Sequence, residues 1–161
     1  MSRPLSVLVI TVSDRASRGE YEDRSGPAVE AELRRAYPGA TVVRRIVADE
    51  MDALVAALRE GRDHDAVLTT GGTGIGPRDI TPEVTRAHCE RDLPGVAEML
   101  RAESRRETLM AALSRGYAGV RGTTVYVNLP GSVKGARSCT ALLVPILEHA
   151  VAMLTGGGHE E

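Results

Sequence analysis

The chain has 161 residues, of which 42% are hydrophobic and 26% charged, and its formal net charge at pH 7 is −2. This length and composition predict one globular domain with its own hydrophobic core. Aromatic residues make up 2% of the chain, with no Phe or Trp. The near-neutral charge and the scarcity of aromatic rings argue against a nucleic-acid-binding protein.

Neither a secretion signal nor a membrane span is expected. The first eight residues hold a short apolar segment, too short for a signal peptide, and no run is expected to reach spanning length. We therefore expect a cytoplasmic protein. Cys89 and Cys139 form no CxxC pair, and His88 stands beside Cys89, where two side chains on a helix diverge too far to share a metal easily. Both cysteines are expected to be structural.

Strand and helix patterns alternate through the first half of the chain. Residues 6–13, SVLVITVS, predict a strand covered on both faces, because apolar β-branched residues dominate the run. A helix is expected over residues 27–36, a strand over 41–47, and a helix from Met51 to about Gly61. A third strand, AVLTT, then leads directly into a glycine-rich loop.

The second half continues the alternation. Thr81 and Pro82 are expected to be the N-cap and first residue of a helix. Another helix is expected from Pro94 to about Arg106, followed by a strand that begins at Thr123. A long last helix is expected to start near Ser132 because its apolar residues recur at intervals of three and four.

The C-terminal region contains a proline within that last helix and a glycine-rich segment after it. Pro145 interrupts the apolar spacing, so a kink or local break is expected there. Residues 156–161, GGGHEE, are expected to be a disordered tail, which leaves residues 1–155 as one domain. The whole pattern predicts a three-layer α/β/α fold with a mostly parallel sheet, whose ligands bind beyond the carboxyl ends of the strands.

The loop LTTGGTGIGPRDITPE, residues 68–83, is the most informative segment. It lacks the Gly-Lys-Ser/Thr ending of a P-loop, and Pro77 replaces the third glycine of the dinucleotide fingerprint. Glycines still allow backbone N–H groups to approach an anion, and a following helix adds a favourable dipole. The loop predicts a phosphate site. The alternative is that its glycines only form tight turns.

Charged residues near this loop point to a cation. Asp79 would repel bound phosphates unless Mg²⁺ intervened, and Mg²⁺ commonly binds one or two carboxylates together with phosphate oxygens. Asp49 has the alternative of capping the helix that follows it. Arg78 is equally compatible with a phosphate contact and with an ion pair. Lys134 could reach a phosphate, but a surface lysine is the simpler interpretation.

The stretch GGTGIGPRDITPEVT resembles the signature of the MogA/MoaB family of molybdenum-cofactor biosynthesis proteins, which includes the G domain of gephyrin. The stretches VSDRASRGEYEDRSGP and LSRGYAGVRGTTVYVNLPG support the resemblance, as does the ADE of residues 48–50. The resemblance implies a homotrimeric molybdopterin adenylyltransferase that joins the AMP of Mg-ATP to molybdopterin and releases pyrophosphate. It also implies a molybdenum insertase as a possible partner, with no role for nucleic acid or membrane.

The same resemblance assigns site residues. It implies that Asp49 and Asp79 are the catalytic acids and metal ligands, and that Ser104 and Ser114 lie near the pterin. The implied nucleotide- and phosphate-binding residues are Ser13, Asp14, Gly71, Gly72, Thr73, Gly74, Asn128, Pro130 and Gly131. No catalytic His or Cys is required, because the phosphate of molybdopterin is already an anion that can attack ATP.

Two alternative functions remain open from the sequence. The first is a non-catalytic pterin-binding or assembly protein of the MoaB type. The second is a nucleotide pyrophosphatase that resembles CinA and hydrolyses the nucleotide instead of transferring it.

Overall fold

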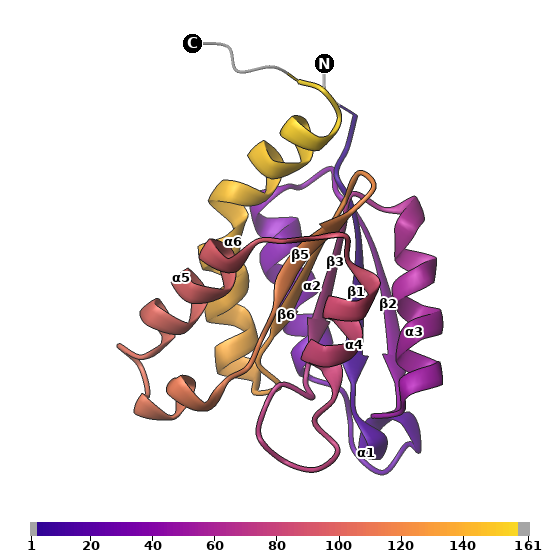
Figure 1. The fold of residues 1–161 in the computed structure, drawn as a ribbon, viewed down its shortest axis with the longest axis vertical. Coiled ribbons are helices and arrows are strands. Elements are labelled where there is room, and N and C mark those ends of the chain that lie inside the picture. Colours follow the sequence, from indigo (N-terminus) through magenta and orange to yellow (C-terminus); the bar gives the residue numbers. More distant parts are fainter. Residues whose placement is uncertain (1–2, 158–161) are drawn as a thin grey trace.

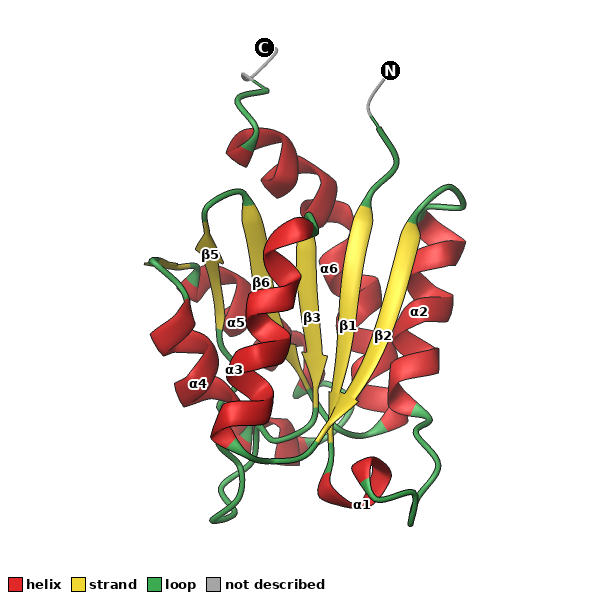
Figure 2. Ribbon diagram, turned by 90° about the vertical axis from the view of Figure 1, so that its right-hand side faces the viewer, coloured by secondary structure: helices red, strands yellow, loops and turns green. Residues whose placement is uncertain are grey.

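The computed structural model describes residues 3–157, which form a six-stranded sheet with helices on both faces (Figures 1 and 2). The strand order is β2-β1-β3-β6-β5-β4. The four strands β2, β1, β3 and β6 are parallel, whereas β5 and β4 are antiparallel to their neighbours. The strands are β1 Ser6–Val12, β2 Thr41–Val47, β3 Ala66–Thr70, β4 Arg91–Asp92, β5 Ala118–Arg121 and β6 Thr124–Leu129.

The helices divide between the two faces of the sheet. Helices α2, α5 and α6 pack on one face and α3 and α4 on the other. Their bounds are α1 Asp14–Ser17, α2 Ser25–Ala36, α3 Met51–Glu60, α4 Thr81–His88, α5 Pro94–Ser104 and α6 Val133–Leu154. Short 3-10 helices follow α3, at Gly61–Asp63, and α5, at Leu109–Leu113.

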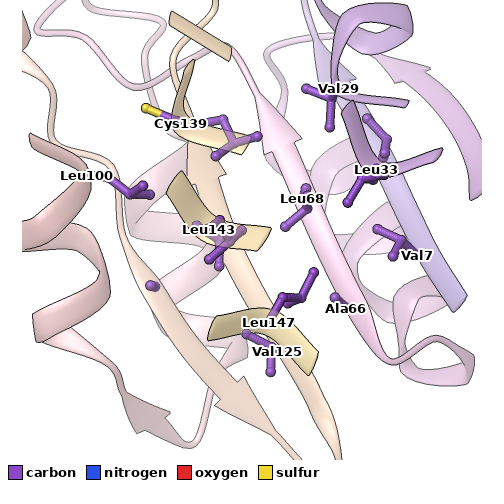
Figure 3. Close-up of a cluster of buried hydrophobic side chains, with 14 of the residues drawn as sticks. Val7, Val29, Leu33, Ala66, Leu68, Leu100, Val125, Cys139, Leu143 and Leu147 are labelled. Atoms are coloured by element: carbon purple, nitrogen blue, oxygen red, sulfur yellow. The ribbon is translucent and has the colours of Figure 1, made fainter. Parts of the chain in front are cut away.

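The core forms because successive residues of a buried strand point to opposite faces. Val7 and Val9 of β1 pack with the α2 and α6 layer, and Figure 3 shows Val7, Leu68 and Leu143 within that cluster. Leu8 and Ile10 of the same strand pack instead with α3 and α4. Strand β1 is therefore apolar throughout because both of its faces are covered.

The expected parallel strands and the helices beside them are confirmed, but a hairpin was missed. Strands β5 and β6 are joined through Gly122 and Thr123, and Gly122 has a φ of 56°. A two-residue turn that contains glycine is a known hairpin signal. The last strand was expected to begin at Thr123, which is a residue of this turn. The turn was therefore not recognised, and the antiparallel edge of the sheet was not predicted.

Two further expectations need correction, and a third falls mostly outside the described residues. Thr81 is the first residue of α4, and the N-cap is Ile80. The Thr81 hydroxyl donates to the carbonyl oxygen of Gly71 at 3.0 Å, so it supports the glycine loop and not the helix end. Helix α6 runs past Pro145 without the expected break. Of the expected tail, residues 158–161 lie outside the described part of the chain.

Helix α6 also departs from the expectation about membrane spans. By length and composition alone it could cross a membrane. Its inner face, with Ala136, Cys139, Leu143 and Leu147, is buried in the core against the sheet. The apolar character of α6 therefore has an explanation in packing.

Asn128 connects the sheet to its neighbours through buried hydrogen bonds. Its Oδ1 accepts the Tyr117 backbone N–H at 3.1 Å, and its Nδ2 donates to Thr69 Oγ1 at 2.9 Å and Thr85 Oγ1 at 3.0 Å. The residue is 4% exposed. Its side chain is thus occupied by the fold itself.

Asn128→Ala is expected to lower the free energy of unfolding by roughly 2–3 kcal/mol, because it leaves the buried Tyr117 N–H without an acceptor. Urea-induced unfolding measures the change, with Asn128→Asp as a comparison that keeps the acceptor oxygen. An Asn128→Ala protein as stable as the wild type would show that these hydrogen bonds do not stabilise the fold.

Candidate active site

The glycine loop begins where β3 ends, and two of its glycines are required by the backbone. Gly71 and Gly72 have φ values of 101° and 69°, a conformation that side-chain-bearing residues rarely adopt. A Cβ on Gly71 would also overlap the carbonyl oxygen of Val12, and one on Gly72 would overlap the Thr81 hydroxyl. The backbone conformation therefore requires glycine at these two positions.

Gly74 differs because its φ is not positive. A Cβ there would lie 2.9 Å from Asp79 Oδ2. Gly74→Ala, the natural test of phosphate access to the loop, would therefore also displace Asp79.

Arg115 holds the loop in place, and sequence reasoning missed it. Its Nε donates to the carbonyl oxygen of Gly74 at 2.7 Å and its Nη2 to that of Asp79 at 2.7 Å. Its Nη1 pairs with Glu83 of α4, and its backbone N–H donates to Thr73 O at 2.9 Å. Arg115 follows the predicted Ser114 directly in the LSRGYAG stretch, so the motif contained the signal.

A cavity of about 490 Å³ adjoins the loop beyond the carboxyl ends of β3 and β6. Of the predicted residues, those that line it are Gly72, Thr73, Gly74, Asp79, Ser104, Ser114, Asn128, Pro130 and Gly131. Arg101 and Lys134 add positive charge, Asp79 and Glu107 add negative charge, and Ala97 and Leu100 add an apolar wall. A ligand with both charged and apolar parts suits this combination.

Ser104, Lys134 and Arg101 of this cavity have partners within the protein, and Arg101 Nη1 donates to the carbonyl oxygen of Gly116 at 2.6 Å. Ser104 Oγ lies 3.3 Å from Cys139 Sγ, and burial raises the pKa of that thiol, so it stays protonated. Lys134 Nζ lies 3.6 Å from Glu107 Oε2 with 79% of its side chain exposed. An exposed pair of this kind is weak, which leaves Lys134 able to turn toward a ligand.

A second cavity, of about 250 Å³, lies on the other side of the glycine loop. Ser13, Gly71 and Gly131 line it together with Thr11 and Asp23. Gly131 belongs to both cavities, and a Cβ on it would lie 3.2 Å from the Gly71 Cα. The predicted nucleotide residues are therefore divided between two adjoining spaces, and Asp14 lines neither.

Asp14 and Asp49 bind each other's backbone. The Asp14 N–H donates to Asp49 Oδ2, and the Asp49 N–H donates to Asp14 Oδ1, both at 3.0 Å. Arg78 completes the cluster, because its Nε donates to Asp14 Oδ2 at 2.6 Å and its Nη2 to Oδ1 at 3.0 Å. For Arg78 the ion-pair alternative therefore describes the structure.

The two acids have opposite electrostatics. The hydrogen bond from Arg78 lowers the pKa of Asp14 below its ordinary value. Burial raises the pKa of Asp49, and the neighbouring charges of Asp14 and Asp79 raise it further. Asp49 does not cap α3, since the N-cap is Glu50 and no side chain bonds to that helix end. The capping alternative for Asp49 is thus wrong.

The carboxylates of Asp49 and Asp79 lie beside the glycine loop. Asp79 Oδ2 accepts the Gly76 N–H at 2.9 Å, and Asp49 Oδ2 accepts the Asp14 N–H. Among residues 3–157 neither Oδ1 atom has a protein donor, and no group of three or more His, Cys, Asp or Glu side chains forms a complete metal site. Two carboxylates plus phosphate oxygens is a usual arrangement for Mg²⁺.

The fold and this site define an α/β protein with a cavity at the carboxyl edge of its sheet, the place where such sheets bind ligands. Residues 8–149 match the family described as "Probable molybdopterin binding domain", so the chain belongs to that family.

Individual relatives agree with this assignment. Molybdopterin adenylyltransferase from Helicobacter pylori strain J99 is 40% identical over 152 residues, 92% of this chain and 86% of the relative. The Drosophila melanogaster molybdenum cofactor synthesis protein cinnamon is 38% identical over 91% of this chain, which spans about 25% of that longer protein.

Solved structures support the same conclusion. MoaB from Thermus thermophilus superposes with a TM-score of 0.86 at 44% identity, covering 94% of this chain and 97% of that one. CinA from Thermoplasma acidophilum has a TM-score of 0.66 at 21% identity, over 92% of this chain and 99% of that one. The likeness to CinA shows a shared fold alone.

Asp49→Asn is expected to raise the free energy of unfolding at pH 7. The pKa of Asp49 is raised in the folded state, so its stabilising contribution is present at low pH and lost as pH rises through that pKa. An uncharged amide avoids this loss and keeps an acceptor for the Asp14 N–H. The gain should shrink as pH falls through the raised pKa of Asp49 and should be absent below about 4, near the ordinary aspartate pKa.

Urea unfolding at pH 7 and in acid measures this difference. Asp63→Asn, at a side chain that is 82% exposed, is the matched control and should change little. A less stable Asp49→Asn protein at pH 7 would show that the charge stabilises the fold.

Proposed function

We propose that this chain is a molybdopterin adenylyltransferase of molybdenum cofactor biosynthesis, which uses Mg-ATP and releases pyrophosphate. The observation that carries the proposal is the position of the 490 Å³ cavity directly beside the glycine loop and Asp79. Relatives named molybdopterin adenylyltransferase, at 36–40% identity over most of the chain, support it.

The reaction transfers AMP between two phosphate groups. A terminal phosphate oxygen of molybdopterin forms a bond to the α-phosphorus of ATP, and the bond between that phosphorus and the bridging oxygen to the β-phosphate breaks. Pyrophosphate leaves with the bonding electron pair. The attacking phosphate is an anion at neutral pH because its second pKa is about 6, so the site needs no strong general base.

Positioning and charge neutralisation then become the main tasks of the protein. Backbone N–H groups of the glycine loop would face the ATP phosphates, with Lys134 and Arg101 on the cavity wall. Asp79 and Asp49 would hold Mg²⁺, which supplies positive charge to the phosphates and the leaving group. Asp49 and Asp79 would in turn lose their mutual repulsion when the ion binds.

The two cavities suggest where each substrate lies. The larger one offers Ser104, Ser114 and an apolar wall for the pterin. The smaller one, with Ser13 and Gly71, is available to the nucleotide. Gly131 borders both cavities, so the phosphates of the two substrates would meet beside it.

Incubation of the purified protein with α-labelled ATP, Mg²⁺ and molybdopterin tests the proposal. Adenylylated molybdopterin and pyrophosphate in equal amounts are the expected products. Pterin binding without any product would indicate a non-catalytic binding protein. ATP hydrolysis that does not require the pterin would indicate a pyrophosphatase.

Asp79→Asn is expected to reduce adenylyl transfer by at least about 100-fold, because charge compensation around the phosphates is lost. The fold should change little, since an amide oxygen can still accept the Gly76 N–H. The assay is initial-rate transfer at saturating Mg²⁺, with Asp63→Asn as the control. Near-normal turnover would remove Asp79 from the metal site.

We also propose a cytoplasmic homotrimer that can deliver its product to a molybdenum insertase. Ile75, Leu109, Met110 and Leu113 are exposed large apolar residues near the larger cavity, with Leu109 75% exposed. Such surface is usually covered by another protein or by a ligand. Light scattering at micromolar concentration should give three times the chain mass, and a monomer mass would contradict the trimer.

A further inference from the structure

A cavity of about 360 Å³ lies far from the glycine loop, beside the C-terminal ends of α3 and α4. Its lining residues are Val55, Arg59, Arg62, Ala87, His88 and Arg121. Arg121 pairs with Thr124 at the start of β6, whereas the larger cavity adjoins the end of that strand. The length of β6 therefore separates the two sites by roughly 17–20 Å.

The lining of this cavity is strongly basic. Three of its six residues are arginines, and none is acidic. Within residues 3–157, Arg59 makes no ion pair or hydrogen bond through its side chain, and Arg62 has one distant partner, Asp63, at 4.0 Å. Arg121 donates from Nη1 to the carbonyl oxygen of His88 at 2.7 Å. The chain as a whole carries a net charge of −2, so this concentration of positive charge is local.

His88 adds a second, independent observation. Its ring meets Tyr126 edge-on at 4.8 Å between centroids, and in the described part of the chain its buried Nε2 has no hydrogen-bond partner. Burial lowers the pKa of His88, and Arg121 and Arg59 lower it further, while Glu90 opposes them. The residue that carries this unsatisfied nitrogen therefore also lines the basic cavity.

We propose that this cavity binds an oligophosphate anion, either pyrophosphate or the phosphate chain of a nucleotide, through Arg59, Arg62 and Arg121. A planar guanidinium group can bind two phosphate oxygens at once. The three positive charges match an oligophosphate with a charge of about −3 better than they match a single phosphate group. Val55, Ala87 and the His88 ring form the rest of the lining. The site does not depend on the proposed adenylyl transfer.

A structural role for the same arginines gives a different expectation. Arg59 and Arg121 lie near the C-terminal ends of α3 and α4, where positive charge stabilises a helix. In that case their removal would lower thermal stability and leave anion binding unchanged. The side chains of Arg59 and Arg62 donate no hydrogen bond to the backbone among the described residues, so replacing these two separates the alternatives.

The test is a proton NMR titration of the His88 ring with sodium pyrophosphate, without Mg²⁺ and at constant low ionic strength. The resonance is identified by its loss in His88→Gln. Pyrophosphate should shift it saturably and raise the pKa of His88. In Arg59→Gln/Arg62→Gln the affinity should fall at least about tenfold, while the control Arg35→Gln on α2 should bind like the wild type. Sulfate should bind at least about tenfold more weakly than pyrophosphate.

Three results would overturn the proposal. These are an unmoved His88 resonance at millimolar pyrophosphate, unchanged binding in Arg59→Gln/Arg62→Gln, and an equal loss in Arg35→Gln. Equal affinity for sulfate would reject the oligophosphate assignment. A parallel titration with ATP identifies the source of the anion: saturation at lower concentration than pyrophosphate assigns the site to a nucleotide, and the reverse order assigns it to free pyrophosphate. Adenylyl transfer is measured separately, so its failure would not affect this result.

Discussion

Two carbonyl oxygens of the glycine loop, those of Gly74 and Asp79, accept hydrogen bonds from one guanidinium group, that of Arg115. The same group pairs with Glu83 on α4. These bonds link the loop after β3 to the segment that precedes β5, which is distant in sequence. Because a guanidinium presents its donors in a fixed plane, the link sets the shape of the loop and the position of Asp79 together.

The charges of the site follow from that geometry. Asp14, Asp49 and Asp79 gather around a loop that offers no side-chain cation except Arg78, which is already bound to Asp14. Burial and the charges of Asp14 and Asp79 raise the pKa of Asp49, so its carboxylate form is disfavoured in the free protein. Strain of this kind is common where a ligand or ion completes the site. Stability and catalysis are therefore expected to oppose each other at Asp49.

Local sequence patterns predicted most of the fold and part of the site. Strand β2 and the helix after it were predicted from residue periodicity, and the glycine loop was predicted to follow a buried strand. Periodicity could not reveal β4, because Arg91–Asp92 has only two residues. The role of Thr81 was assigned wrongly because it depends on a contact with Gly71, ten residues away, that no local pattern encodes.

Electrostatic partnerships were harder still to predict. The pairing of Arg78 with Asp14 spans 64 residues, and the bond from Arg115 to Gly74 spans 41. Spacing along the chain contains no information about such contacts unless a family resemblance supplies it. The resemblance identified Asp49, Asp79 and Ser114, which lie at or near the loop. Its LSRGYAG stretch contains Arg115, but that residue was given no role, and the resemblance did not point to the basic cavity at the opposite end of the strands.

The role of Arg115 in positioning the glycine loop is tested most directly by the rate at which Arg115→Lys forms adenylylated molybdopterin, with thermal unfolding recorded on the same samples. A lysine ammonium keeps the charge but cannot serve the Gly74, Asp79 and Glu83 acceptors in one plane. A fall in kcat/KM of about 100-fold is expected, with a melting temperature close to that of the wild type. A variant with wild-type kcat/KM would contradict the claim that this guanidinium positions the glycine loop for catalysis.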